Sequence, residues 1–269
     1  SGDIDVDGTT NLDVVDIDGA VDMASTLQVD GAITGSSTIN GVGISSNITN
    51  FANSILISND AGTGTLSTAS NNTGLGWEVF DDLTEGDNLV GIGYQALTKN
   101  TTGRNNTAVG YTALAANTTG TGNVAVGLST LDVNTTGDNN TGIGTGALGG
   151  NTTADSNTAV GNSALNANTT GTGGTAVGAL SLDAVTTGDY NTGVGFTSGS
   201  KVTTGTRNVA LGAFALQEAT TGNDNTYVGY AAGAATTTAS NNVAVGKSSL
   251  AANTTGASNT AVGTFSMDA

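Results

Sequence analysis

The sequence has no cysteine, proline or histidine in 269 residues, and aromatic residues make up only 4 % of it. Without cysteine, no disulfide reports the redox compartment, although such a chain suits an oxidising exterior. The hydrophobic content of 36 % consists mostly of alanine and valine. Large side chains are therefore too few for a conventional globular core, and any core must be narrow and filled by small residues.

Positive charge is also scarce. Five Lys and Arg stand against 22 Asp and Glu, which gives a net charge of −17. This charge would repel nucleic acid and anionic membrane surfaces. No run of 18 apolar residues is present, so we expect no membrane insertion. No signal-peptide pattern stands at the start, and since the sequence stops part-way through a repeat, we interpret it as a piece of a longer chain.

Glycine, by contrast, occupies 42 positions and marks a strict repeat. A glycine that follows Val, Ile or Leu recurs every 17 residues without insertion or deletion. The twelve glycines are Gly76, Gly93, Gly110, Gly127, Gly144, Gly161, Gly178, Gly195, Gly212, Gly229, Gly246 and Gly263. Globular loops tolerate length changes, so this register predicts that each copy stacks on its neighbours. A turn with positive φ, or no room for a Cβ atom, is the expected reason for the glycine.

The positions before the glycine predict a short strand. The residue directly before it is Val, Ile or Leu, the residue three before it is Thr or Val, and Ala or Gly stands between them, except at Tyr227. One face is thus apolar or β-branched and the other is small, which suggests that another surface lies close against the small face. Leu recurs four residues after the glycine, apart from gaps such as Gly199 and Gly233. We expect this second apolar column to line the same interior as the first.

Asparagine forms two further columns, four residues before the glycine and seven residues after it. Asn suits turns, and stacked amides can hydrogen-bond as ladders. Seventeen residues leave room for two short strands and two turns per rung. The sequence therefore predicts an all-β fold, a parallel β-solenoid (β-roll) of twelve 17-residue rungs over residues 76–269. Parallel rungs would make it a rod about 55 Å long, stabilised by stacking.

The remainder of the chain follows looser patterns. In residues 1–50, turn signals such as Asp5-Val-Asp-Gly8 and Asp16-Ile-Asp-Gly19 alternate with aliphatic residues. This predicts an acidic short-strand stalk or attachment segment. Residues 51–75 are interpreted as a connector and first rung that leads into the strict repeat.

The repeat resembles two groups of known proteins. Asn106-Thr-Ala-Val-Gly110 and Asn123-Val-Ala-Val-Gly127 resemble the core pentapeptide of trimeric autotransporter adhesin heads, which are left-handed parallel β-rolls with a shorter repeat. The longer unit at 106–120, Asn-Thr-Ala-Val-Gly-Tyr-Thr-Ala-Leu-Ala-Ala-Asn-Thr-Thr-Gly, is more similar to repeats of phage tail fibres and bacterial surface proteins. The resemblance covers residues 72–269. It implies a left-handed homotrimer with the small-residue face at the trimer axis.

Aromatic residues suggest one contact site. Trp77, Tyr94 and Tyr111 follow the repeat glycine in three successive copies, so stacking in register predicts an aromatic strip that could hold a sugar ring. The alternative is a packed stack or a contact between chains.

Acidic residues suggest two other sites, neither of them complete. Glu78, Asp81, Asp82, Glu85 and Asp87 form a dense cluster. Paired carboxylates can hydrolyse glycosides, but a polar cap is also expected in the first copy. Asp3, Asp5 and Asp7 begin like a calcium loop, yet Val14 stands where an EF-hand supplies its bidentate Glu. We therefore predict no catalytic residue, no metal site and no cofactor.

These patterns predict a structural fibre or adhesin segment that gives reach and host or surface attachment, most specifically as part of a phage tail fibre. The alternatives are a cell-anchored bacterial trimeric adhesin, a monomeric ice-binding β-solenoid with Thr columns, and a glycan-cleaving spike. Expected partners are copies of the chain itself, a cell-surface glycan or protein receptor, and other fibre or virion proteins. The expected location is a virion tail fibre or another extracellular surface, and we expect no enzyme activity.

Overall fold

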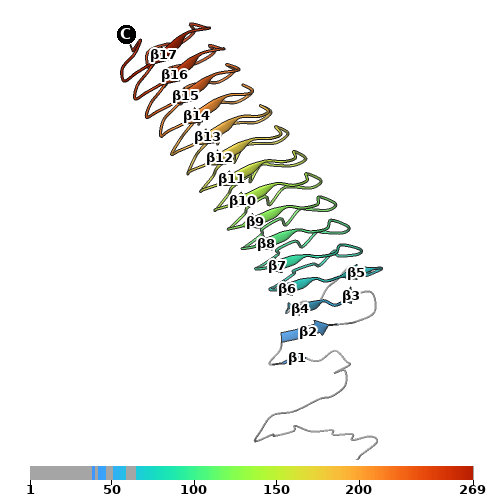
Figure 1. Cartoon of the computed structure of the whole chain (residues 1–269). Helices are drawn as coiled ribbons and strands as arrows, with labels where there is room; N and C mark the ends of the chain where they lie inside the picture. The colour runs from blue at the N-terminus through green and yellow to red at the C-terminus, as the bar shows by residue number, and fades with distance from the viewer. Residues whose placement is uncertain (1–37, 40–41, 47–50, 59–64, 269) are drawn as a thin grey trace, which may run out of the picture. The chain divides into compact units, whose positions relative to one another are not determined.

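A computed structural model describes residues 38–39, 42–46, 51–58 and 65–268, all of which belong to one compact unit, Ser37–Ala269. Most of the predicted stalk of residues 1–50, including Asp3, Asp5 and Asp7, lies outside the described residues. The described chain is all-β and coils as a parallel β-solenoid of about twelve turns (Figure 1). None of these residues forms a helix that could cross a membrane.

The strands fall into two groups. The strands before the repeat and at its first glycine are β1 (Thr38–Ile39), β2 (Val42–Ser46), β3 (Phe51–Ala52), β4 (Ile55–Ser58), β5 (Ala69–Ser70) and β6 (Thr73–Leu75). Those of the following rungs are β7 (Val90–Ile92), β8 (Thr107–Val109), β9 (Val124–Val126), β10 (Thr141–Ile143), β11 (Thr158–Val160), β12 (Thr175–Val177), β13 (Thr192–Val194), β14 (Val209–Leu211), β15 (Thr226–Val228), β16 (Val243–Val245) and β17 (Thr260–Val262). All but β3 and β5 form one sheet, antiparallel from β1 to β4 and parallel from β4 to β17. The residues predicted as a connector thus already carry β4 of the main sheet.

Each repeat contributes one three-residue strand, where the sequence had predicted two. The strands pair in register across 17 residues, as Thr107 with Val124 and Val109 with Val126. The rest of the rung is built from turns in which the second and fourth residues after the glycine have positive φ, for example Thr112 (φ 53°) and Leu114 (φ 51°). The backbone N–H groups of these turns donate to neighbouring rungs, Leu114 to the carbonyl of Thr130 at 3.1 Å. These hydrogen bonds offset the strain of the left-handed conformation.

The repeat glycine has both a positive φ and no room for a Cβ atom, the two properties predicted from its recurrence. Its φ lies between +126° and +140° in all twelve copies. A Cβ added at Gly110 would lie 2.3 Å from the carbonyl oxygen of Gly127 in the next rung. Backbone therefore touches backbone at this corner, and the contact sets how closely the rungs stack.

The orientation of the strand differs from the prediction. The small residue between the two larger ones faces inward and is buried, as Ala108 and Ala125 show. The residues on either side of it, Thr107 and Val109 in β8, face outward and are only half-buried. The prediction that the Val, Ile or Leu before the glycine lines the interior with Leu was wrong, and so was the placement of the small-residue face on an outer surface at a trimer axis. The small-residue face packs inside its own chain.

The interior has room only for this small face because other columns fill it. The Leu column is fully buried, and Leu97, Leu114 and Leu131 have no exposed surface. Where larger core side chains pack against the strand, glycine replaces alanine at its inward position. At Gly91 an added Cβ would lie 2.8 Å from Val79 and 3.0 Å from the Phe80 ring. Core volume thus decides between Ala and Gly.

The predicted amide ladders run through the same interior. Asn123 donates its backbone N–H to Oδ1 of Asn106 at 2.8 Å, and Asn106 Nδ2 donates to the carbonyl of Gly120 at 2.7 Å. In the second column, Asn134 Nδ2 donates to Oδ1 of Asn117 at 2.9 Å. Because each amide gives and receives in sequence, buried polar groups remain satisfied along the stack.

The second ladder is interrupted after Asn168. The next rung carries Val185 in place of Asn, so Oδ1 of Asn168 is buried without a hydrogen-bond partner. An unsatisfied buried acceptor costs about 1–3 kcal/mol. The break shows that the buried amide oxygen of one rung depends on the Asn of the next rung for its hydrogen bond.

Replacing Asn134 with Val should lower the free energy of unfolding by about 1–3 kcal/mol, because Oδ1 of Asn117 loses its donor. The matched control is Asn168→Val, which removes one orphaned oxygen and creates another at Asn151, whose Oδ1 accepts from Asn168. We therefore expect the control to stay closer to wild type in urea unfolding followed by circular dichroism. Equal losses for both variants would show that the ladder bonds do not matter in this way.

Candidate functional site

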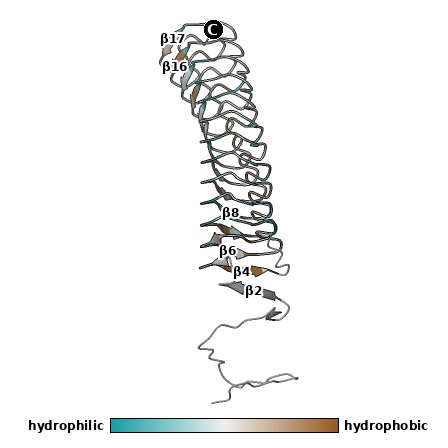
Figure 2. Ribbon diagram, turned by 90° about the vertical axis from the view of Figure 1, so that its right-hand side faces the viewer, coloured by the Kyte–Doolittle hydropathy of each residue, from teal (hydrophilic) through white to brown (hydrophobic). Residues whose placement is uncertain are grey.

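The outward face of the main sheet is an uncharged surface. We call the residues one and three before each glycine the outer columns. Every residue directly before a glycine is aliphatic, and eight of these twelve are more than a third exposed: Leu75, Ile92, Val126, Ile143, Val177, Val194, Val245 and Val262. Figure 2 shows hydrophobic residues recurring in the strands of successive rungs. No charged residue occurs in the outer columns from β6 to β17.

The predicted aromatic strip lies at the corner next to this face. Trp77, Tyr94 and Tyr111 are 43, 40 and 53 % exposed. The rings of Tyr94 and Tyr111 stack at 4.9 Å between centroids with an angle of 9° between planes. The indole of Trp77 makes no such ring contact within the described part of the chain. The two tyrosines thus cover one face of each other.

Glu78 is tied to the next rung. The Glu78 carboxylate accepts a hydrogen bond from Gln95 Nε2 at 2.5 Å. This bond from Gln95 and a second from the Trp77 side chain lower the pKa of Glu78. The backbone N–H of Gln95 donates to the Trp77 carbonyl at 2.8 Å. The next rung therefore holds both the Glu78 carboxylate and the backbone at Trp77.

Beside Glu78 the surface has a hollow of about 460 Å³, a volume within the range of small-molecule sites. Its lining consists of Glu78, Asp81, Asp82, Gln95, Thr98, Lys99, Ala115, Ala116 and Asp132. The hollow exists because Ala115 and Ala116 are short where neighbouring rungs carry longer side chains. Four carboxylates and one ammonium make it negatively charged, and burial raises the pKa of Asp132.

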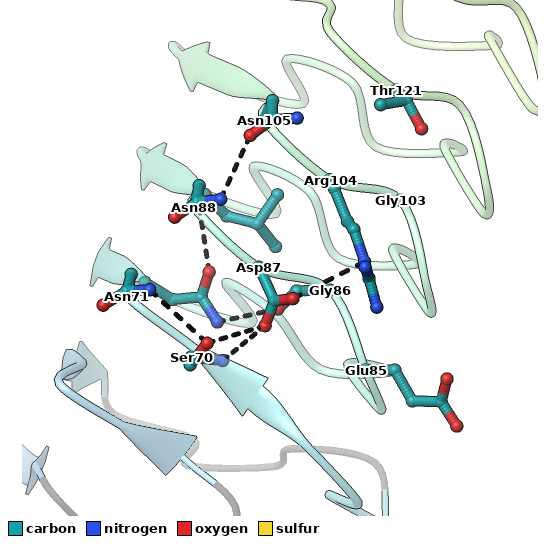
Figure 3. Close-up of polar contacts among 12 residues, drawn as sticks. Ser70, Asn71, Glu85, Gly86, Asp87, Asn88, Gly103, Arg104, Asn105 and Thr121 are labelled. Carbon is teal, nitrogen blue, oxygen red and sulfur yellow. Dashed lines mark hydrogen bonds and ion pairs between the residues drawn. The ribbon is translucent and has the colours of Figure 1, made fainter.

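The structure divides the predicted acidic cluster. Glu78, Asp81 and Asp82 line the hollow, whereas Glu85 and Asp87 do not. Asp87 accepts hydrogen bonds from the backbone N–H and the hydroxyl of Ser70 at 2.9 and 2.8 Å (Figure 3). In Figure 3, Arg104 is directed toward Asp87 and Glu85 points away from it. The Nε atom of Arg104 lies 3.5 Å from Oδ2 of Asp87. Asp87 therefore stabilises the stacking of rungs.

The two carboxyl groups of the hollow with shifted pKa values lie far apart. The carboxyl group with a lowered pKa is Glu78, and the one with a raised pKa is Asp132. They lie three rungs apart, or about 14 Å along the stack. Acid and base or nucleophile in glycosidases are about 5–9.5 Å apart. This pair is therefore wider than the carboxyl spacing of a glycosidase.

A second aromatic group was not predicted from the sequence. Phe214 contacts Phe196 and Tyr230 edge to face, at centroid distances of 5.6 and 5.7 Å. Phe214 stands two residues after its glycine, whereas the other two stand one after theirs, so the group does not follow a single column. Its pairing depends on the turn geometry, which the repeat pattern does not give.

The threonine columns give ice binding little support. The first Thr of each pair is engaged with its neighbour, as when Thr118 Oγ1 donates to the carbonyl of Thr135 at 3.0 Å. The second, such as Thr119, is exposed. A Thr two residues further on, which would share its face, occurs in three non-consecutive rungs, at Thr121, Thr172 and Thr206. Asp or another residue interrupts the array elsewhere.

No family model, curated protein or solved structure matches this chain. The resemblance to adhesin heads and tail fibres therefore remains a prediction from the repeat.

Proposed function

We propose that the chain is a structural segment of an attachment fibre, as in phage tail fibres, in which three copies associate through the outer columns of the sheet. The uncharged outer face is the observation that carries this proposal. Its mechanism is mechanical: the stacked rungs give reach, and three copies multiply weak contacts with a surface. The left-handed coil and the three-fold symmetry are part of the proposal, as the repeat's resemblance implies.

Charge distribution supports the choice of face. All charged residues from Gly76 to Asp268 lie in the corner and turn positions, away from the outer columns. A net charge of −17 would otherwise keep copies apart. Interface centres are depleted of charge and surrounded by a polar rim. The outer columns fit such a centre, and the turns fit the rim.

The size of the face is also appropriate. Twelve strands about 4.8 Å apart give a stripe about 55 Å long and, at one strand in width, about 500 Å² in area. A stable interface buries about 800 Å² per partner. The stripe can therefore supply the apolar centre, with the flanking corner residues supplying the remainder.

The mass of the purified 269-residue chain tests this proposal. Light scattering should give three times the chain mass of 26.0 kDa. Ile143→Asp combined with Val177→Asp places charge at two outer positions that are 41 and 38 % exposed. This variant should dissociate while keeping its circular dichroism spectrum, since like charges would meet across the interface.

The control is Thr136→Asp with Thr170→Asp, which adds the same charge at exposed turn positions of the same rungs. The control should stay associated. A wild-type monomer, or equal dissociation of both variants, would refute association through the outer columns. The cell-anchored adhesin shares this geometry, so the same result would leave both attachment proteins as candidates and remove the monomeric ice-binding solenoid.

A further inference from the structure

We propose that Tyr190 of one copy packs against Phe196 of the next copy, and that this aromatic contact fixes the axial register of the three copies. The inference rests on the proposed association through the outer columns, and it names the residues that decide how the copies align. Both residues belong to one rung and flank its strand β13. Tyr190 precedes the strand by two residues, and Phe196 follows it by two.

The outer columns alone leave the register of the copies undefined. They hold only Thr or Val at one position and only Val, Ile or Leu at the other. If one copy slid by one rung, about 4.8 Å, eleven of the twelve strands from β6 to β17 would still face an equivalent strand. Register is weakly specified where a shift leaves the facing side chains equivalent. Selecting one alignment requires a feature that occurs at one rung, as a single polar residue does in coiled coils.

A ring of three parallel copies brings opposite edges of the outer face together. Each interface in such a ring is heterologous, so the edge before the strand in one copy meets the edge after the strand in its neighbour. From β6 to β17, the position two residues before the strand holds one aromatic residue, Tyr190, and otherwise Asn, Gly, Ser, Arg or Asp. The rung of β13 is therefore the one rung in this range with an aromatic residue at both edges. In register, these two residues meet.

Tyr190 is the most exposed aromatic side chain among the described residues, at 62 %. Its ring lies against Gly173 of the preceding rung, where an added Cβ would be 2.7 Å from Cδ1 of the ring. The glycine thus gives the ring room to lie along the stack, while most of the side chain remains exposed. A ring supported in this way loses little freedom when a partner covers it.

Phe196, at the other edge, is 50 % exposed and is supported by later rungs. Its ring contacts Phe214 edge to face at 5.6 Å, and Phe214 contacts Tyr230 at 5.7 Å. Val194, two residues before Phe196, is 38 % exposed, so this aromatic surface continues the outer columns. Exposed aromatic residues that continue an apolar face are typical anchors of interfaces between proteins.

The occupant of this surface is a second copy, because the outer columns need additional area to form a stable contact. They supply about 500 Å² against about 800 Å² per partner in a stable interface. Tyr190 and Phe196 adjoin the columns on either side and add uncharged surface to them. The charge nearest to Tyr190 in its column is Arg207, which pairs with Asp224 of its own chain at 2.6 Å. The edge therefore keeps its suitability for a like-charged copy.

Disulfide formation measures the register, since the chain contains no cysteine of its own. Ser156 and Asn162 are exposed residues at the two edges of the rung of β11, two rungs before β13. Ser156→Cys with Asn162→Cys should form disulfides between copies that are in register. Ser156→Cys with Thr145→Cys and Ser156→Cys with Ala179→Cys are matched reporters of a shift by one rung in either direction. Within one chain, the strand separates the two edges by about 10 Å, beyond the Cα separation of about 4.4–6.8 Å in a disulfide.

The in-register pair should form at least about tenfold faster than either shifted pair, because a shifted copy loses its aromatic contacts. Adding Tyr190→Ala should bring the three rates within about twofold of one another, while the mass stays at three chains and the circular dichroism spectrum is unchanged. Tyr111→Ala is the control, because it removes a 53 % exposed aromatic residue whose opposite edge carries Asn105. It should keep the preference for the in-register pair. Non-reducing electrophoresis measures the rates.

The outcomes separate this inference from the proposed function. If the chain forms the three-copy species but all reporters react equally, or if Tyr190→Ala keeps the in-register preference, the aromatic contact does not set the register and the attachment function stands. Disulfides formed by Ser156→Cys alone would show that like edges meet, as in an antiparallel pair, and would also overturn the contact. A single-chain mass for the wild type would refute the proposed association itself, and the contact with it.

Discussion

Replacing Gly161 with alanine should lower the free energy of unfolding by about 2–6 kcal/mol, the sum of backbone strain and overpacking. The φ of Gly161 is +135°, and an added Cβ would lie 2.6 Å from the carbonyl carbon and oxygen of Gly178. Backbone at both sides of this contact is held by neighbouring rungs, so neither side can move alone. Urea unfolding followed by far-ultraviolet circular dichroism measures the effect.

Gly263→Ala is the matched control for this experiment. Its φ of +126° carries similar strain, but the nearest heavy atom to an added Cβ is 3.9 Å away. We expect this variant to lose only the strain, about 1–2 kcal/mol. A loss in Gly161→Ala no larger than that of the control would show that contact between rungs at the glycine does not limit their stacking.

Tyr227→Ala should lower the free energy of unfolding by about 3–5 kcal/mol. Tyr227 occupies the inward strand position that holds Ala or Gly in the other rungs, and none of its surface is exposed. Its hydroxyl lies 3.1 Å from Thr236 Oγ1, and burial raises its pKa. The space for the ring comes from Gly233, which stands in the Leu column, where an added Cβ would lie 2.6 Å from the ring.

Gly233→Leu should rescue Tyr227→Ala, because the double variant restores the Ala and Leu of the other rungs. Alone, Gly233→Leu would place its side chain in the space that the Tyr227 ring occupies. This clash should destabilise the protein by about 1–3 kcal/mol or more. The double variant should be more stable than either single variant, short of wild type by the strain of Leu at positive φ, about 1–2 kcal/mol. Additive losses in a double-mutant cycle would contradict the exchange of volume between the two positions.

The spacing of residues predicted the stacking but not the direction in which the strand faces. The 17-residue glycine register and the Asn columns follow directly from counting, and both correspond to contacts between adjacent rungs, such as Asn123 with Asn106. Hydrophobicity placed Val109 inside, and the family resemblance placed Ala108 at a contact between chains, whereas Val109 faces outward and Ala108 is buried in its own chain. The deciding factor is the volume left by Leu114 and the amide ladders, which only the three-dimensional interior shows.

The turns were equally hidden in the sequence. Leu is a poor choice for a left-handed conformation, yet Leu114 has a φ of 51°. Hydrogen bonds to the next rung and full burial hold it there, so long-range contacts override the local preference. For the same reason, the hollow beside Glu78 was not predicted, since it joins residues from four rungs. Only the aromatic column at its edge was visible in the sequence.

The unbroken contact of glycine with glycine at every rung has a consequence for how such a chain can change length. Because each unit meets the next through the same atoms, a duplication or loss of one 17-residue unit inside the array preserves every junction and alters the length by about 4.8 Å. Unequal recombination between the similar DNA segments that encode the units would produce such changes. Reach can therefore evolve in discrete steps, independently of the side chains on the first rungs.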